Sequence, residues 1–529
     1  MPEPLRLKGI AASSGYAEGP LFPIDIAHAE YRAHGEPGVE AAALKAALER
    51  AAMRIGNLIG DASDESAAML EFQLAMLEDE ALTGPAFVAI AEGKPANDAW
   101  VEAIDAEIVG YEVADDEYFR ARAADMKDIR AQVLRALTDA GDDRSPPGAI
   151  LFGEDIAPTR FLETDWSGGG GIALTGGSTA SHVAMLARSR GIPMVVGLGR
   201  AVSVKGLALL DAEHGGIVVS PDRDDIETFR RSAQNFDQRS ARAADFLSRP
   251  AVTRTGEPVR VQVNIADPAD VEHIDIASCD GVGLMRTEFL FGKASGLPDE
   301  ETQYRAYRKV LEWSVGKPVT IRTVDAGGDK PVPGFTVGES NPFLGLRGIR
   351  LSLARPEIFR LQARALLRAA VHGNLKVMFP MIAVPDEYAR SVALFAGEAG
   401  NLAKAGVAHA MPPLGIMVEV PSVAIAPAGF ADVAFFSIGS NDLTQYVMAA
   451  ARDNGTVAHL NSVLNPAVIA LIASVAKFGR EHGIPVSLCG DAGGDPAAIP
   501  ALLKAGLRDL SVVPAQLARA KATIADVAV

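Results

Sequence analysis

Residues 414–420, LGIMVEV, and residues 433–440, VAFFSIGS, are short apolar runs that each end in polar residues. Six similar runs follow residue 251, and stretches with helical periodicity separate them. Eight alternating strand and helix units over roughly 250 residues are typical of a (β/α)8 barrel. An open doubly wound sheet is the competing topology, and the regular alternation of eight units disfavours it. The other six runs are VRVQVNI (259–265), GVGLMRT (281–287), VTIRTVD (319–325), KVMFPMI (376–382), PVSLCG (485–490) and LRDLSVVP (507–514).

Polar side chains stand at the ends of several of these runs. In a parallel barrel the carboxyl ends of the strands line the active site, so these side chains are expected to converge. Guanidinium groups bind phosphate and carboxylate through paired donors, and two carboxylates with few other ligands suit Mg²⁺. Each residue alone is compatible with an ordinary ion pair or a small buried group, but their common position favours a binding site. The set is Arg286, Arg322, Glu419, Asn441, Asp442 and Cys489.

A second informative stretch, IALTGGSTASHVAMLAR (172–188), lies upstream of the barrel. It combines a strand-like run, a loop of small polar residues and an amphipathic run that begins at His182. A histidine at the start of a helix faces free backbone N–H groups and the positive end of the helix dipole, which stabilise a bound phosphoryl group. A capping role is the simpler interpretation of a lone histidine. The composition of the loop, together with the barrel residues, favours a phosphorylated histidine.

The hydrophobic pattern divides the chain into an α/β domain, a helical domain, a linker and the barrel. Residues 1–34 and 141–221 carry short strand-like runs and are expected to form one α/β domain around an inserted all-helical domain, 35–140. Residues 222–250 are expected to form a charged linker helix, and residues 251–529 the barrel. The predicted fold class is therefore multidomain α/β.

Composition excludes several classes of protein. A chain of 529 residues is too long for one core and should form about three domains. The net charge of −17 argues against a nucleic-acid or anionic-membrane surface, and it is compatible with a basic protein partner. With two cysteines, no signal-peptide pattern and no membrane-length apolar run, a reduced cytoplasmic enzyme is expected.

The stretch before His182 resembles the phosphohistidine motif Gly-Gly-x-Thr-Ser-His of the phosphoenolpyruvate-utilising enzymes, with Ala180 as an additional residue between Thr179 and Ser181. This family includes enzyme I of the bacterial phosphotransferase system, pyruvate phosphate dikinase and phosphoenolpyruvate synthase. The likeness to the enzyme I branch extends over nearly the whole chain. Its segments are MLEDE (76–80), DDEYFRARAAD (115–125), GLMRTEFLF (283–291), RTVDAGGDK (322–330), NPFLGLRGIR (341–350), MVEVP (417–421), SIGSNDLTQY (437–446) and LCGDAGGD (488–495).

The resemblance implies a phosphoenolpyruvate–protein phosphotransferase. In such an enzyme Mg²⁺-dependent transfer moves the phosphoryl group from phosphoenolpyruvate to His182 and then to a histidine of the phosphocarrier protein HPr, with release of pyruvate. The resemblance also implies a swivelling phosphohistidine domain and a homodimer formed through the barrel. It assigns substrate binding to Arg286, Arg322, Asn441, Asp442 and Arg452, metal binding to Glu419 and Asp442, and proton donation to Cys489.

The same chemistry could serve a regulatory, nitrogen-type phosphorelay instead of sugar uptake. A dikinase or synthase needs a large nucleotide-binding domain before the histidine, and the roughly 150 preceding residues contain no glycine-rich phosphate loop. An inactive scaffold is disfavoured because no matched catalytic residue is missing.

The helical domain is expected to dock HPr through acidic side chains, since these complement a basic rim on a partner. For any one of these residues, a solvated helix face is an equally good interpretation. The residues are Asp64, Glu65, Glu71 and Glu78 to Glu80.

Overall fold

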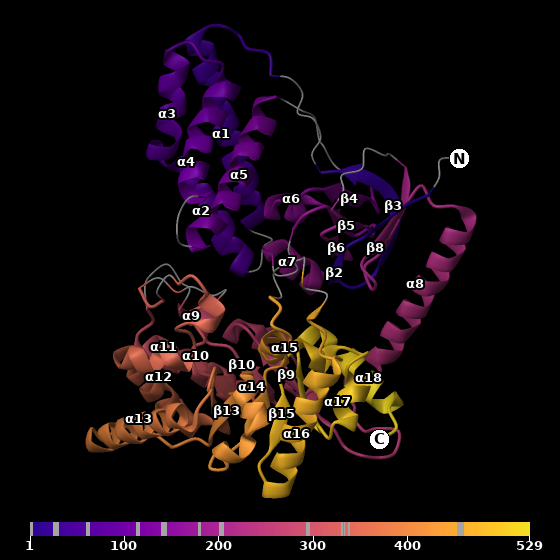
Figure 1. The fold of residues 1–529 in the computed structure, drawn as a ribbon. Helices are drawn as coiled ribbons and strands as arrows, with labels where there is room; N and C mark the ends of the chain where they lie inside the picture. The colour runs from indigo at the N-terminus through magenta and orange to yellow at the C-terminus, as the bar shows by residue number, and fades with distance from the viewer. Residues whose placement is uncertain are drawn as a thin grey trace. The chain divides into compact units, whose positions relative to one another are not determined.

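The computed structural model separates the chain into two compact units, Met1–Phe236 and Asp237–Val529 (Figure 1). No described helix is long and apolar enough to span a bilayer. The described residues are 4–24, 31–59, 64–112, 117–138, 145–177, 181–199, 206–291, 297–328, 332, 334–336, 339–451, 457 and 460–529.

The first unit contains an eight-stranded mixed sheet in the order β1-β8-β7-β3-β4-β5-β6-β2. The strands β3, β4, β5 and β6 run parallel to one another, and the other neighbours pair antiparallel. Helix α6 (Pro158–Glu163) connects β4 to β5, and α7 (His182–Arg190) connects β5 to β6. The strands are β1 (Leu5–Lys8), β2 (Ile10–Ser13), β3 (Tyr16–Pro23), β4 (Ile150–Gly153), β5 (Gly171–Leu174), β6 (Met194–Val196), β7 (Leu207–Asp211) and β8 (Gly216–Val219).

Five helices stand between β3 and β4 in the chain and lie alongside one another in Figure 1. Apolar residues recur every three or four positions on α1, where Leu44, Ala47, Ala51 and Ile55 are buried, so this helix presents one stripe to a core. Trp100 fills the same core. The helices are α1 (Pro37–Ile59), α2 (Asp64–Glu78), α3 (Glu80–Ala91), α4 (Ala96–Glu112) and α5 (Glu117–Leu137).

The second unit is a closed barrel of eight parallel strands, in which the last strand, β16, pairs with the first, β9. Strands β10, β11 and β13 are buried along their whole length, as expected where a sheet is covered on both faces. The predicted barrel is therefore confirmed. The strands are β9 (Arg260–Ile265), β10 (Val282–Met285), β11 (Val319–Arg322), β12 (Leu375–Phe379), β13 (Leu414–Val418), β14 (Phe436–Ile438), β15 (Val486–Leu488) and β16 (Asp509–Val512).

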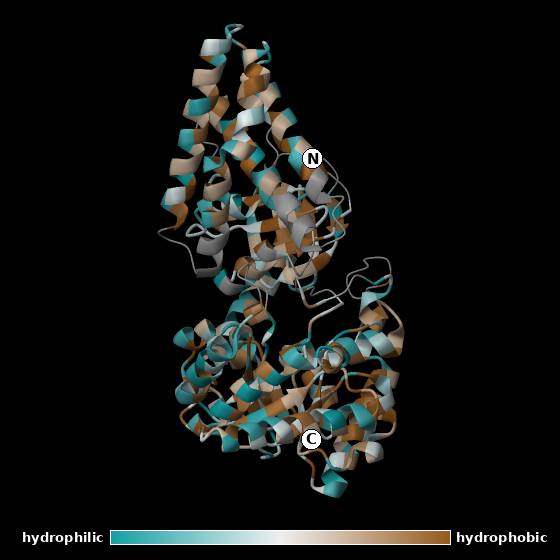
Figure 2. Ribbon diagram, turned by 90° about the vertical axis from the view of Figure 1, so that its left-hand side faces the viewer, coloured by the Kyte–Doolittle hydropathy of each residue, from teal (hydrophilic) through white to brown (hydrophobic). Residues whose placement is uncertain are grey.

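The barrel helices are amphipathic, and Figure 2 shows hydrophobic and hydrophilic residues on different faces of them. On α12, for example, Ile358, Phe359 and Leu366 are buried while Glu357 and Arg360 are exposed. Helix α8 (Arg223–Ala244) connects the two units along the chain. The helices of the barrel are α9 (Glu288–Phe291), α10 (Glu300–Trp313), α11 (Ile349–Ala354), α12 (Pro356–Ala369), α13 (Pro385–Lys404), α14 (Pro421–Ile425), α15 (Ser440–Met448), α16 (Pro466–His482), α17 (Ile499–Lys504) and α18 (Leu517–Asp526).

Candidate active site at the carboxyl end of the barrel

The predicted barrel residues all stand at the same end of the strands. Arg286 follows β10, Arg322 is the last residue of β11, and Glu419 follows β13. Asn441 and Asp442 lie in the first turn of α15, directly after β14, and Cys489 follows β15. Because the strands are parallel and closed into a barrel, these side chains belong to one rim. Arg452 lies outside the described residues.

Arg322 is held by two carboxylates that the sequence did not single out. Its Nη2 atom lies 3.0 Å from Oε2 of Glu288, and its Nη1 atom lies 3.2 Å from Oδ2 of Asp325. Glu288 also accepts a hydrogen bond from the backbone N–H of Asp325. The Arg322 side chain is 5% exposed, and these carboxylates keep its pKa above the ordinary value although burial opposes the charge. The guanidinium is therefore charged and fixed in direction.

A second buried guanidinium, that of Arg347, completes this network. Its Nη2 and Nε atoms lie 2.9 and 3.3 Å from the two oxygens of Asp325. Nη2 is also 3.6 Å from Oδ2 of Asp442, and Nη1 lies 3.2 Å from the hydroxyl oxygen of Tyr446. Burial raises the pKa of Tyr446 to about 12, so its hydroxyl is protonated at neutral pH. Arg347 thereby joins α15 to the segment after β11, which carries Asp325.

Glu419 and Asp442 form a pair of buried carboxylates beside these guanidiniums. Burial, and then repulsion from Asp442 and Asp325, raises the pKa of Glu419 to about 8. Oε1 of Glu419 accepts a hydrogen bond from the backbone N–H of Met381. Oδ1 of Asp442 is buried and accepts no hydrogen bond from any described residue. Such a pair fits a divalent cation that completes its coordination with water and phosphate oxygens.

The thiol of Cys489 lies among apolar side chains inside the barrel. Burial raises its pKa to about 11, so the thiol keeps its proton at neutral pH. The Sγ atom lies 3.7 Å from the carbonyl oxygen of Ile438. The apolar neighbours are Leu284, Met378, Met417 and Phe435.

Asn441 and Arg286 differ in whether their side chains are already bound by neighbouring residues. The amide of Asn441 donates to Asp491 over 2.9 Å, and its oxygen accepts from the backbone N–H of Asp491 over 3.0 Å. Among the described residues Arg286 has no ion-pair partner, and its backbone N–H donates to Ile265. Its guanidinium is consequently available to an anion.

In the first unit, α7 begins at His182. Ser181 caps the helix, because its hydroxyl accepts a hydrogen bond from the backbone N–H of Ala184, and the left-handed Gly191 ends it. The predicted position of the histidine at a helix start is thus confirmed. The side chain of His182 and residues 178–180, which include Ala180, lie outside the described part of the chain.

Sequence reasoning missed Glu288, Asp325, Arg347 and Tyr446 as parts of the site. All four lie inside the quoted motifs, and Glu288 and Asp325 each follow a predicted arginine by two or three positions. This short spacing was a signal in the sequence that could have identified Glu288 and Asp325, because a buried guanidinium needs a carboxylate partner.

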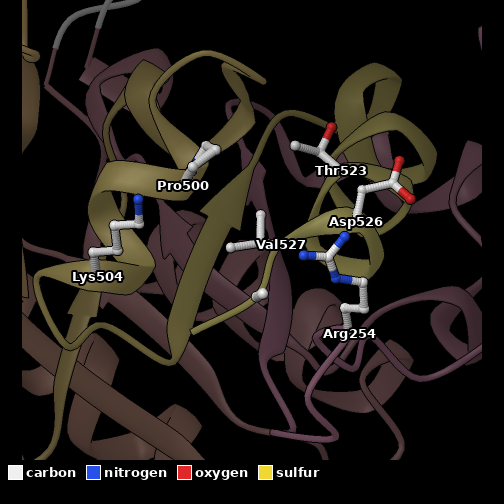
Figure 3. Close-up of a pocket in the computed structure, with 7 residues that line it drawn as sticks. Arg254, Pro500, Lys504, Thr523, Asp526 and Val527 are labelled. Carbon is white, nitrogen blue, oxygen red and sulfur yellow. The ribbon is translucent and has the colours of Figure 1, made fainter.

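A pocket of about 300 Å³ lies elsewhere on the barrel (Figure 3). Arg254 precedes β9, and its backbone N–H donates to Val527 just beyond α18, so the pocket belongs to the amino end of the strands. That end of a barrel serves stability, and none of the predicted site residues lines the pocket. The lining residues are Arg254, Pro500, Lys504, Thr523, Asp526, Val527 and Ala528.

Three family models match the chain in order. Residues 8–122 match the N-terminal region of PEP-utilising enzymes, and residues 145–220 match their mobile domain. Residues 240–529, which hold the barrel, match the PEP-binding domain of PEP-utilising enzymes.

Curated relatives match over nearly the full length. A phosphoenolpyruvate-protein phosphotransferase of Priestia megaterium is 36% identical over 98% of this chain and 93% of the relative. Proteins of the same name from Geobacillus stearothermophilus and Bacillus subtilis are 37% and 34% identical, over 98% of this chain and 92% and 94% of the relatives.

Proposed function

The chain belongs to the phosphoenolpyruvate–protein phosphotransferases, the enzyme I family of the phosphotransferase system, and we propose that His182 carries the phosphoryl group from substrate to acceptor. The observation that carries this assignment is the convergence of fixed guanidiniums and carboxylates at the carboxyl end of the PEP-binding barrel. In support, His182 lies in the segment that matches the mobile domain and begins a capped helix.

Phosphoenolpyruvate binds with its phosphate between Arg286 and Arg322. Arg322 is already fixed by Glu288 and Asp325, so its donors need no reorganisation when the phosphate arrives. Asn441 and Arg452 hold the carboxylate end of the substrate. Arg286, without an ion-pair partner among the described residues, is the more adaptable of the two phosphate ligands.

Glu419 and Asp442 would hold Mg²⁺. The proposal is supported by the buried Oδ1 atom of Asp442, which accepts no hydrogen bond from a described residue, and by the position of Glu419, whose pKa is raised by burial and then by the neighbouring carboxylates Asp442 and Asp325. Bound there, Mg²⁺ supplies positive charge to the oxygens of the phosphoryl group.

His182 attacks phosphorus through a ring nitrogen, so an N–P bond forms while the P–O bond to the substrate breaks. The enolate left behind takes a proton at carbon from the Cys489 thiol and becomes pyruvate, and solvent later returns a proton to the thiolate. The buried environment of Cys489 suits this role, since it keeps the thiol protonated.

His182 then passes the phosphoryl group to an HPr-like phosphocarrier that docks on the helical domain. Glu71, Glu78 and Glu80 are exposed there and offer negative charge to a basic partner. The barrel provides the contact of a homodimer. These assignments require the α/β domain, residues 1–34 and 141–221, to carry His182 between the barrel and the carrier.

The test is labelling of the full chain with phosphate-labelled phosphoenolpyruvate and Mg²⁺. Wild-type protein should take up one acid-labile, base-stable label, and His182→Ala should take up none. His214 in the turn after β7 is a matched control, because it pairs with Asp211 and lies in the same domain, and His214→Ala should label normally. Normal labelling of His182→Ala would overturn the assignment.

A further inference from the structure

Tyr446 joins three elements at the carboxyl end of the barrel. It lies on α15 one turn after Asp442, so the two side chains share a face of the helix. Its hydroxyl oxygen is 2.5 Å from the carbonyl oxygen of Phe343, in the turn Pro342–Leu344, and 3.2 Å from Nη1 of Arg347. A guanidinium only donates hydrogen bonds, so the hydroxyl accepts from Arg347 and gives its single proton to Phe343.

Three nitrogens of Arg347 are held in this network. Nη2 and Nε donate to Asp325, and Nη1 donates to Tyr446. Nη2 is 3.6 Å from Oδ2 of Asp442, which is an ion-pair distance but too long for a hydrogen bond. The guanidinium is thus kept beside Asp442 without taking either of its oxygens, and Oδ1 of Asp442 accepts no hydrogen bond from any residue that the structure describes.

We propose that Tyr446 is a positioning residue that acts through Arg347 and keeps the Asp442 carboxylate available to a divalent cation. The inference rests on the proposed role of Asp442 as a metal ligand. Without the hydroxyl, Nη1 of Arg347 has no acceptor inside a buried site, which is unfavourable. The guanidinium then turns toward the neighbouring Asp442 and competes with the cation for its oxygens.

The phenol is well suited to this task because it is a neutral acceptor. A carboxylate in its place would add negative charge beside Asp325 and Asp442, while an apolar side chain would leave Nη1 unpaired. The same hydroxyl fixes the Phe343 carbonyl, and the Arg347 guanidinium lies 5.8 Å from the centre of the Phe343 ring. Loss of the hydroxyl therefore loosens both the guanidinium and the turn that covers it.

The test measures phosphoenolpyruvate binding by calorimetry at a series of Mg²⁺ concentrations. The parent is the full chain carrying His182→Ala, so that binding is not followed by turnover. Tyr446→Phe in this parent should raise the Mg²⁺ concentration for half-maximal binding by about tenfold, the order expected for one hydrogen bond to a charged group. The variant should therefore need more Mg²⁺, while its affinity for phosphoenolpyruvate at saturating Mg²⁺ stays near that of the parent.

Tyr388 on α13 is the matched control. Its hydroxyl also donates to a barrel carbonyl, that of Leu414, over 3.1 Å, and it takes no part in the Arg347 network. Tyr388→Phe should lower the melting temperature, by less than Tyr446→Phe because it removes one hydrogen bond to a neutral group, and it should leave the Mg²⁺ requirement unchanged. If Tyr446 has only a structural role, Tyr446→Phe will also leave the Mg²⁺ requirement unchanged. That result would overturn the inference.

A second variant tests the route through Arg347. Arg347→Lys keeps the charge but lacks the planar set of donors that reaches both Asp325 and Tyr446. In the Arg347→Lys background, Tyr446→Phe should add no further change in the Mg²⁺ requirement. If Tyr446→Phe raises the Mg²⁺ requirement as much in the Arg347→Lys background as in the parent, Tyr446 does not act through Arg347. Absence of Mg²⁺-dependent binding in the His182→Ala parent would instead contradict the proposed function itself.

Discussion

The backbone nitrogen of Met381 lies 2.6 Å from Oε1 of Glu419 and donates a hydrogen bond to it. Met381 has a φ of 57°, a region that residues with a side chain rarely adopt and that is found where surrounding packing enforces it, often at functional sites. On the other side, a Cβ atom at Gly439 would lie 3.0 Å from Oε2 of Glu419. The backbone thus fixes one oxygen of this carboxylate and leaves space beside the other.

Glu419→Gln should abolish Mg²⁺-dependent phosphoenolpyruvate binding, yet stabilise the cation-free protein at high pH. The raised pKa of Glu419, about 8, means that this group favours the folded state at low pH and that its contribution is lost as the pH rises through 8. Glutamine stays neutral, and its amide oxygen can still accept from Met381.

Thermal unfolding in EDTA should show this gain in the stability of Glu419→Gln. At pH 9 the variant should be more stable than wild type, and the difference should shrink as the pH falls and disappear below the ordinary pKa of about 4.5, where the carboxyl group is protonated in both the folded and the unfolded states. A variant that is less stable than wild type at pH 9 would show that the charged form of Glu419 is not unfavourable in the folded protein.

Cys489→Ala should slow pyruvate formation by about 100-fold or more, the usual contribution of a positioned proton donor. Binding of phosphoenolpyruvate should be retained, because the thiol is uncharged at neutral pH and is not one of the groups proposed to hold the substrate. The other cysteine, Cys279, is buried away from the predicted site residues, near the start of β10, and Cys279→Ala is the matched control. Equal rates for the two variants in a pyruvate-release assay would remove Cys489 from the chemistry.

Glutamine substitution of Glu71, Glu78 and Glu80 together should lower the rate of phosphoryl transfer to HPr by roughly tenfold at low salt, because steering by complementary charge speeds encounter. The dependence of the rate on ionic strength should weaken as well. Labelling by phosphoenolpyruvate should not change. Glu107→Gln on α4, an exposed acidic residue of the same helical part, is the control. An unchanged transfer rate in the triple variant would place the HPr contact elsewhere.

The barrel was predictable from sequence because its signal is carried by the chain locally. Each strand is a short apolar run, such as LGIMVEV, that is buried on both faces, and turns with polar residues end it. The rim residues were equally accessible, since a position just after a strand fixes the end of the barrel to which a side chain belongs. Arg322 and Glu419 were found in this way.

The partners of those residues were not predictable, because they depend on three-dimensional packing. Arg347 lies 22 positions from Asp325 in the chain and 99 from Tyr446, and no periodic pattern connects such residues. The raised pKa of Glu419 also follows from burial beside Asp442 and Asp325, which no single segment reveals. The left-handed backbone of Met381 is likewise invisible in a sequence where glycine would have been the expected residue.

A buried carboxylate in the first unit gives a prediction about the contact between α5 and α6. Asp128 of α5 accepts hydrogen bonds from Thr159 of α6, over 2.8 Å, and from the amides of Gln73 and Gln132, over 3.2 Å. Burial raises the pKa of Asp128 although these donors oppose the shift. The group therefore favours folding below its ordinary pKa near 4, and that contribution is lost as the pH rises through the raised folded value.

Asp128→Asn should consequently make α5 at least as stable as in wild type at pH 7, with the difference vanishing near pH 4. The amide stays neutral, and it can donate to Oε1 of Gln73 or Gln132, two buried atoms that accept no hydrogen bond from the described residues.

Thr159→Val, in contrast, removes a donor from a buried carboxylate and should cost about 1–3 kcal/mol at pH 7. Amide hydrogen exchange of α5 in the full chain measures both, because it reports this contact without assuming two-state unfolding of several domains. Faster exchange of α5 in Asp128→Asn than in wild type at pH 7 would mean that the ionised carboxylate is a net source of stability, and that the donors around it outweigh its burial.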